Sequence, residues 1–126
     1  MEKKKYISLN DVKAYKIAFH LSNYVWDVVV RWDHFAQNTI GRQLVNAIDS
    51  ISANLAEGFG RYHKKDKIKF YRYSFGSVKE SLDWNEKSKV RSLLKQEEYE
   101  HIYEQLSFLP KEINGLIKLT NRKLTI

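Results

Sequence analysis

The chain has 126 residues, 43% of them apolar, which is enough to bury the core of one domain without a metal ion or a cross-link. It contains no cysteine, so disulfides, thiolate metal sites and cysteine nucleophiles are excluded. The formal charge of +7 favours a polyanionic partner. The charged start Met1–Lys5 leads into mixed polar sequence rather than the apolar segment of a secretory signal, so we expect a cytoplasmic protein. No apolar stretch approaches the roughly 20 residues that span a bilayer, so we expect no membrane partner.

Apolar residues recur at helical spacing in four stretches, which predicts an all-α fold. The first stretch runs from about residue 9 to 31. The second runs from about 38 to 59, where Gly58 and Gly60 are suited to end a helix. The third runs from about 64 to 94, with an apolar face made of Ile68, Tyr71, Phe75, Val78 and Leu82. The fourth runs from about 97 to 122 and contains Pro110, so we expect a kink or a break between residues 106 and 109. Together these predict an antiparallel up-down-up-down four-helix bundle occupying residues 1–126 as a single domain.

The second stretch lacks the charged face of an ordinary surface helix, because only Asp49 and Glu57 are charged between residues 43 and 60. We therefore expect it to be covered on nearly every side. Either it is central within one chain, or it packs against other copies of the chain, which we favour. Apolar residues outside the core stripe of the first helix support self-association, namely Trp26, Val29, Val30 and Trp32. The remaining faces of the second stretch carry small and polar residues: Ser50, Ser52, Ala53, Asn54, Ala56, Glu57, Gly60 and Arg61.

A basic cluster begins where the third stretch begins, with six Lys or Arg residues and one Asp between positions 61 and 72. Lysines in the first turn of a helix oppose its dipole, so they indicate an anion-binding role. The predicted nucleic-acid contacts are Arg61, Lys64, Lys65, Lys67, Lys69, Arg72 and Lys79. Nearby Tyr62, Phe70 and Tyr73 would stack on bases or pack within the protein. Alternatively, the cations pair with the acidic start of the fourth stretch, at Glu97, Glu98, Glu100 and Glu104.

The sequence gives no pattern for catalysis, and we predict a non-enzymatic protein without cofactors. His20, His34, His63 and His101 are scattered and lack the spacing of a metal helix, so no metal site is expected. Glu57 and Glu80 are the acids expected at buried helical positions, paired with arginine or bonded to Asn54. A hydrolase using either carboxylate would need an open cleft around it.

Several of these residues also form a recognisable set: Gln43, Ala47, Ser50-Ile51, Asn54-Leu55-Ala56-Glu57-Gly58-x-Gly60-Arg61, Phe70 and Gly76-Ser77-x-x-Glu80. In this set the chain resembles the four-helix-bundle family encoded by intervening sequences of bacterial 23S ribosomal RNA genes. The resemblance implies a ring of five antiparallel bundles. The family is also similar in architecture to the accessory variability determinants of diversity-generating retroelements, which are basic pentamers that bind nucleic acid and a reverse transcriptase.

The resemblance implies that the motif residues serve packing and assembly, namely Ser50, Asn54, Glu57, Gly58, Gly60, Gly76, Ser77 and Glu80. The chain departs from the pattern at Val45 and Asn46, where the family tends to have arginine, at His63, where Ser or Thr is common, and at Pro110.

Our leading hypothesis is a homo-oligomer, pentameric by resemblance, that binds RNA or DNA through its basic surface as an accessory to an RNA-processing or reverse-transcription complex. The alternative is a protein-interaction scaffold that binds no nucleic acid directly.

Overall fold

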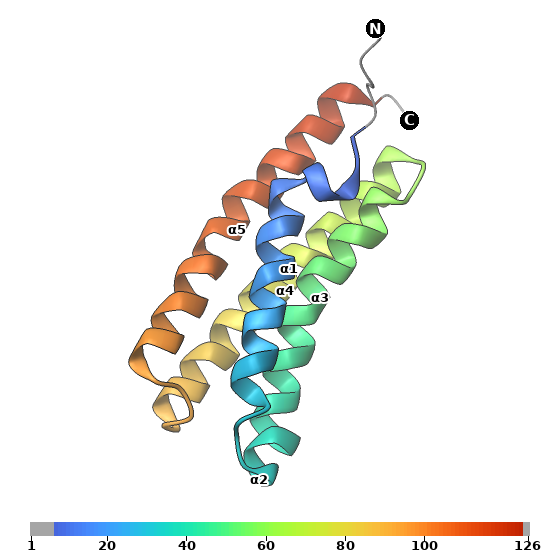
Figure 1. Cartoon of the computed structure of the whole chain (residues 1–126). Helices are drawn as coiled ribbons and strands as arrows, with labels where there is room; N and C mark the ends of the chain where they lie inside the picture. Colours follow the sequence, from blue (N-terminus) through green and yellow to red (C-terminus); the bar gives the residue numbers. More distant parts are fainter. Residues whose placement is uncertain (1–6, 125–126) are drawn as a thin grey trace, which may run out of the picture.

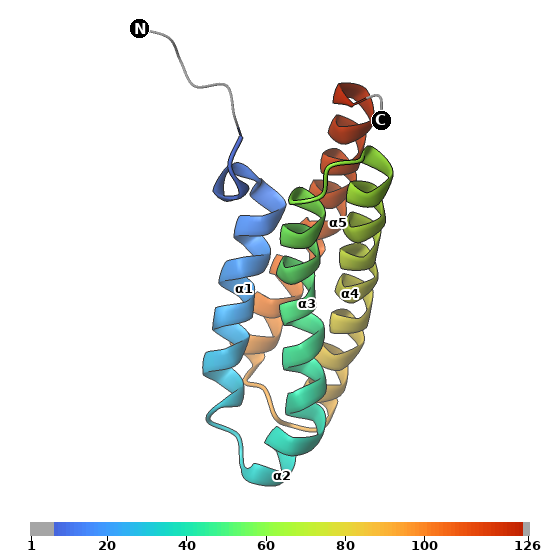
Figure 2. The same cartoon turned by 90° about the vertical axis from the view of Figure 1, so that its right-hand side faces the viewer.

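The computed structural model describes residues 7–124, and within that range the chain is helical and contains no strand. The charged start at residues 1–5, on which the expectation of no secretory signal rests, lies outside it. The four long helices are α1 (Lys13–Val29), α3 (Arg42–Phe59), α4 (Lys64–Val90) and α5 (Gln96–Lys123). Three short segments complete the fold: η1 (Leu9–Asp11), α2 (His34–Ala36) and η2 (Gln37–Gly41). The predicted all-α fold of four long helices is confirmed, and Figures 1 and 2 show these helices packed lengthwise into a bundle. No helix in the described range is long and apolar enough to cross a membrane.

The connections between helices lie at two ends of the bundle. In Figure 1 the segment joining α1 to α3 and the loop joining α4 to α5 lie at the lower end, while the α3–α4 loop and the last turn of α5 lie at the upper end. The basic start of α4 is therefore at the upper end, and the acidic start of α5 is at the lower end. The 27 residues of α4 separate the two ends by about 40 Å at a rise of 1.5 Å per residue.

The first connection is more structured than the sequence predicted. Helix α1 ends at Val29 rather than Arg31, and α2 and η2 precede α3. Asp33 caps α2 by accepting a hydrogen bond from the Ala36 amide at 2.9 Å. The Gln37 side chain donates to the Val30 carbonyl at 2.9 Å and to the Val29 carbonyl at 3.2 Å, so carbonyls at the end of α1 have partners. These polar contacts explain why the chain turns here without a long loop.

The hydrophobic core runs the length of the bundle and receives side chains from all four long helices. Its fully buried large members are Leu21, Val25, Leu44, Ile48, Ile51, Leu55, Tyr71, Val78, Ile102, Leu106, Leu109 and Ile113. Most of these lie on the predicted apolar faces. Helix α4 is the exception, because Ile68, Phe75 and Leu82 are only partly buried.

The buried face of α4 is instead largely polar, which the sequence did not predict. Ser74, Ser81, Asn85 and Ser88 are all buried. The Ser74 hydroxyl donates to the Ile51 carbonyl of α3 at 2.8 Å, and the Asn85 amide donates to the Tyr99 carbonyl of α5 at 3.3 Å. Because the serines are small, and Ser74 and Asn85 bond the backbone of neighbouring helices, α4 packs closely without a continuous apolar stripe.

Helix α5 continues through Pro110 as a single element from Gln96 to Lys123 (Figure 1), so the predicted break into two helices is wrong. A proline removes one backbone donor and crowds the preceding turn. The core residues Leu106, Leu109 and Ile113 flank the proline, and all three are fully buried. Their burial on both sides of Pro110 holds the two halves of the helix on the same core.

Candidate nucleic-acid interface

Four of the predicted contact residues line one shallow groove between α4 and α5 at the upper end of the bundle. Lys64, Lys65, Lys69 and Arg72 lie in it together with Ile68 of α4 and Asn121 of α5, around a volume of about 540 Å³. A second hollow of about 190 Å³ shares Arg72 and adds Phe75, Asn114 and Ile117. The two hollows therefore adjoin at Arg72, and together they present four cations from α4 and two asparagines from α5.

The groove cations have no acidic partner among residues 7–124: Lys64, Lys65, Lys69 and Arg72 make no ion pair there. The acids expected to neutralise them lie at the other end of the same chain. Glu98 is buried there, where it accepts from Arg31 at 3.1 Å and from the Lys95 amide at 2.9 Å. Pairing between the basic cluster and the acidic start of α5 within one chain is therefore wrong, and pairing between chains stays a prediction.

The first turn of α4 also offers backbone N–H groups that no capping side chain uses. His63 occupies the N-cap position without a side-chain hydrogen bond to the helix. Exposed amides at a helix N-terminus carry partial positive charge and favour an anion. The groove thus combines this dipole with the charges of the lysines.

Lys67 has a different environment from the other cations of the cluster. Its ammonium group donates to the Phe59 carbonyl at 2.7 Å and lies 3.5 Å from the Gly58 carbonyl, so it binds the C-terminal end of α3. Burial lowers the pKa of Lys67. The structure therefore gives Lys67 a role in joining α3 to α4, on a different side of α4 from the groove.

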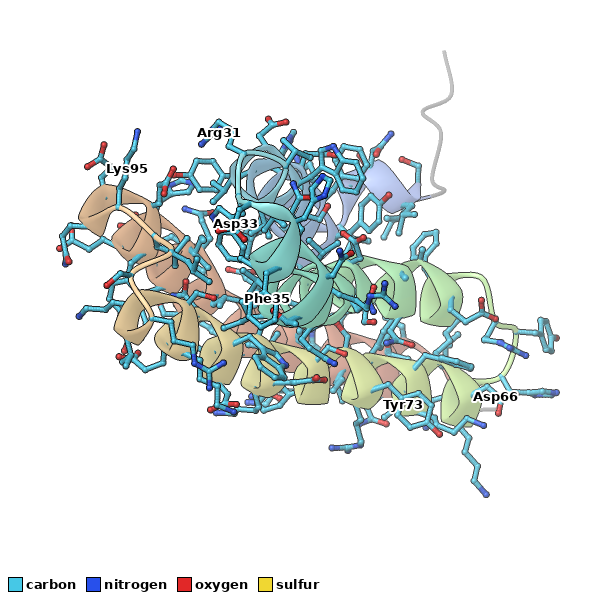
Figure 3. The ribbon with its side chains drawn as sticks, turned by 90° about the horizontal axis from the view of Figure 1, so that it is seen from below. Arg31, Asp33, Phe35, Asp66, Tyr73 and Lys95 are labelled. Atoms are coloured by element: carbon cyan, nitrogen blue, oxygen red, sulfur yellow. The ribbon has the colours of Figure 1, made fainter. Side chains whose placement is uncertain are left out.

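Arg61 and Lys79 do not line the groove. Arg61 forms an ion pair with Glu57 at 2.6 Å, and its guanidinium lies 4.7 Å from the centre of the Phe70 ring. Lys79 is exposed, with its ammonium 5.6 Å from the centre of the Phe75 ring. Of the aromatic residues expected to stack on bases, Tyr62 and Tyr73 are exposed, and Figure 3 labels Tyr73 on the outer side of α4.

Gly58 serves packing between α3 and α4. A Cβ atom at this position would lie 2.7 Å from Cε1 of Tyr71 and 2.9 Å from the Lys67 carbonyl oxygen. Helix α3 ends at Phe59 as predicted, and Gly60 at its C-cap has a φ of −80°, so it does not adopt the left-handed conformation common after helices. The Gly-x-Gly motif therefore provides close contact at Gly58 rather than a special turn.

The other motif residues make few contacts with the rest of the chain. Ser50 and Asn54 donate to carbonyls of their own helix, at 2.8 Å and 2.9 Å. A Cβ atom at Gly76 would meet nothing within 4 Å, and Ser77 is half-buried. The surface at Gly76 is thus open among the described residues, whereas Ser50, Asn54 and Ser77 are half-buried.

The expectation that Glu57 and Glu80 are buried is wrong, because both are exposed. Glu57 pairs with Arg61, and Glu80 accepts from the Trp84 indole at 3.1 Å. Neither lines the groove between α4 and α5. Among residues 7–124 the buried acid is Glu98, which the sequence suggested only as a partner for the basic cluster. Within residues 7–124, no cluster of three or more His, Asp or Glu side chains is suited to hold a metal.

The outer face of α3 is exposed within one chain, so the idea that this chain alone covers the helix is wrong. Asn46, Asp49, Ala53 and Glu57 all face outward. Cover by a second copy stays a prediction. Large apolar side chains are also exposed, including Trp26 at 58% and Phe35 at 79%. Figure 3 labels Phe35 in the view from below.

A profile of the family described as 23S rRNA-intervening sequence protein matches residues 10–115. The chain belongs to this family. The match includes the groove cations of α4 and most of α5, and it confirms the resemblance carried by the glycine-containing motif. A comparison with curated protein sequences finds no match.

Among solved structures, the chain is similar to a Bacteroides thetaiotaomicron VPI-5482 protein described as of unknown function from the S23 ribosomal protein family. The two share 18% sequence identity with a TM-score of 0.74, covering 83% of this chain and 98% of the other. At this identity the likeness concerns the fold.

Proposed function

We propose that this protein is a non-enzymatic, homo-oligomeric bundle that binds RNA or DNA through the groove between α4 and α5. The observation that carries the proposal is the convergence of Lys64, Lys65, Lys69 and Arg72 on one groove without an acidic partner in the described residues. Clustered cations that no acid neutralises release counterions from a polyanion on binding, which is the main source of non-specific nucleic-acid affinity.

The spacing along α4 fits a phosphate backbone. Lys65 and Arg72 are seven positions apart, about 10 Å along the helix axis, which is the axial length of about three phosphates of one DNA strand. The amide side chains of Asn114 and Asn121 provide donors on the opposite wall of the groove. Such contacts position a backbone but do not read bases, so the proposed binding is largely independent of sequence.

Assembly is the second part of the proposal. The exposed face of α3, the open surface at Gly76 and the exposed Trp26 support contacts between copies of an antiparallel bundle. Five copies would carry a formal charge of 5 × (+7) = +35 and present five grooves to one nucleic acid. We propose that such a pentamer acts as an accessory to an RNA-processing or reverse-transcription complex in the cytoplasm.

The test compares two triple variants of equal charge change. Replacing Lys65, Lys69 and Arg72 with Ala removes groove cations, and the matched control replaces Lys16, Lys89 and Arg91, which are exposed elsewhere on the bundle. Binding to a duplex DNA and to an RNA is measured by fluorescence anisotropy across a salt series. We expect the groove variant to flatten the slope of log K against log salt by up to about 2.7 for each engaged groove, at about 0.9 per phosphate contact. Equal slopes in the two variants would reject the groove as the site that binds nucleic acid.

A protein-interaction scaffold is the second candidate, and the exposed acids at the start of α5 favour it. Glu97 and Glu104 are exposed and make no ion pair within the described range, so they are open to the basic groove of another chain or to a different protein, such as a reverse transcriptase. This candidate predicts no binding to RNA or duplex DNA at physiological salt. In that case the groove variant would weaken protein association instead.

A further inference from the structure

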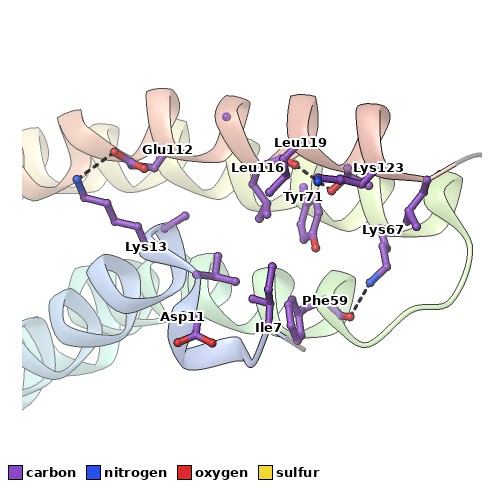
Figure 4. Close-up of a pocket in the computed structure, with 15 residues that line it drawn as sticks. Ile7, Asp11, Lys13, Phe59, Lys67, Tyr71, Glu112, Leu116, Leu119 and Lys123 are labelled. Carbon is purple, nitrogen blue, oxygen red and sulfur yellow. Dashed lines mark hydrogen bonds and ion pairs between the residues drawn. The ribbon is translucent and has the colours of Figure 1, made fainter. Parts of the chain in front are cut away.

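A pocket of about 360 Å³ lies at the upper end of the bundle, on a different side of α4 from the basic groove (Figure 4). It is bounded by the start of α1, the end of α3, the first turns of α4 and the last turns of α5. Its walls are mostly apolar, with side chains of Ile7, Val12, Ala14, Phe59, Leu116, Leu119 and Leu124. Its volume falls within the range of small-molecule sites, about 300–1,000 Å³, which are likewise apolar with a few placed polar groups.

Tyr71 provides an unused hydrogen-bond donor to this pocket. The residue is only 1% exposed, and its ring packs over Gly58. No partner within residues 7–124 bonds its hydroxyl group, and Figure 4 shows the phenol oxygen pointing into the pocket, away from Leu119. A ligand that brings an acceptor into the pocket therefore receives a hydrogen bond from this hydroxyl.

The charged side chains around the pocket favour an anionic ligand near Tyr71. Three lysines line it, Lys13, Lys67 and Lys123, against the two acids Asp11 and Glu112. Lys13 pairs with Glu112 at 3.5 Å, and Asp11 accepts hydrogen bonds from Ser8. Lys67 uses two carbonyls of α3 and retains a third N–H on its ammonium group. The Tyr71 hydroxyl and the Lys67 ammonium therefore each retain a hydrogen to donate to a ligand in the pocket.

We propose that this pocket binds a small amphipathic anion, an aliphatic carboxylate, whose head accepts hydrogen bonds from the Tyr71 hydroxyl and the Lys67 ammonium. The aliphatic tail lies against Leu116, Leu119 and the other apolar walls. Burial raises the pKa of Tyr71 to about 12, so the phenol stays a neutral donor at physiological pH. The apolar walls disfavour a strongly polar ligand such as free phosphate. The inference is independent of nucleic-acid binding, because it concerns different residues and a different side of α4.

The experiment titrates decanoate into the full-length protein by isothermal calorimetry, with decanol as the uncharged analogue. Tyr71→Phe removes the donor and keeps the ring, and Tyr73→Phe is the matched control on the exposed side of the same helix. Gly115→Leu is a second variant, because a Cβ atom there meets nothing within 4 Å and the added side chain has room to occupy the pocket. Amide chemical shifts from NMR locate the bound ligand.

We expect wild type and Tyr73→Phe to bind one decanoate per chain, with shifts confined to the upper end of α1, α4 and α5. Tyr71→Phe should bind about tenfold more weakly, since a hydrogen bond to a charged group is worth more than a neutral one. Gly115→Leu should abolish binding while the protein stays folded. Absence of decanoate binding by wild type, equal affinity for decanol, or binding that survives both Tyr71→Phe and Gly115→Leu would overturn the proposal.

Discussion

Gly58→Ala tests the close contact between α3 and α4 directly. The added Cβ atom would lie 2.7 Å from Cε1 of Tyr71 and 2.9 Å from the backbone oxygen of Lys67, so either the ring or the start of α4 has to move. Overpacking of this kind costs about 1–3 kcal/mol, whereas exchanging Gly for Ala inside a helix gains about 1 kcal/mol. Because a backbone atom is one of the two obstacles, we expect a net loss of about 1–2 kcal/mol.

The matched control is Gly115→Ala in α5, where the new Cβ atom meets nothing within 4 Å. This variant should gain about 1 kcal/mol from helix propensity alone. Urea unfolding followed by circular dichroism, at one protein concentration for all variants, measures both changes. With a slope of about 2 kcal/mol per molar urea, the Gly58→Ala midpoint should fall by about 0.5–1 M while that of Gly115→Ala rises. If Gly58→Ala is as stabilising as Gly115→Ala, the packing role of Gly58 is refuted.

Four further outcomes follow from the structure. Burial raises the pKa of Tyr71 to about 12, so between about pH 10 and 12 the folded chain keeps a proton that the unfolded chain has lost. The free energy of unfolding that this provides is complete below about pH 10. It is lost as pH rises toward 12, by at most about 1.4 kcal/mol per pH unit. The free energy of unfolding of wild type should therefore fall more steeply with rising pH than that of Tyr71→Phe. Ser81→Ala removes a buried hydroxyl that has no hydrogen-bond partner among the described residues, so thermal unfolding should show unchanged or higher stability, by up to about 1 kcal/mol. Glu98→Gln weakens the bond to Arg31 and the cap on Lys95, and a loss of about 1–2 kcal/mol in urea unfolding is expected; no loss would contradict this role. Ala53→Arg places a charge on the exposed face of α3, so sedimentation velocity should show smaller species at unchanged helicity, whereas unchanged assembly would exclude this face.

The sequence predicted the helices well where apolar spacing decides the structure. The ends of α3 at Phe59 and of α5 near Lys123 lie within a residue or two of the predicted positions. The end of α4 was placed four residues late. Ser92 there adopts a φ of 62°, and no glycine marks the turn, so the sequence carries no ordinary signal for it.

The predictions about individual side chains were weaker, because they depend on contacts between helices. The cluster of cations was found from its charge, but only the packing of α4 against α5 separates Lys65, Lys69 and Arg72 from Lys67, which binds the end of α3. The pocket at Tyr71 was missed altogether. Its walls come from four helices, and each apolar residue in it resembles an ordinary core residue in the sequence.

The polar inner face of α4 has a consequence for how the sequence of this fold can vary. Ser74, Ser81, Asn85 and Ser88 occupy the helix interface with little volume, and Ser74 and Asn85 bond backbone carbonyls, which every residue type provides. Selection on this face therefore acts on side-chain size more than on apolar character. Small residues can replace one another there with little change in packing, whereas a leucine would push α3 and α5 apart. Two chains can thus share the bundle while their α4 sequences have little in common, and hydrophobic patterns alone will underestimate how similar they are.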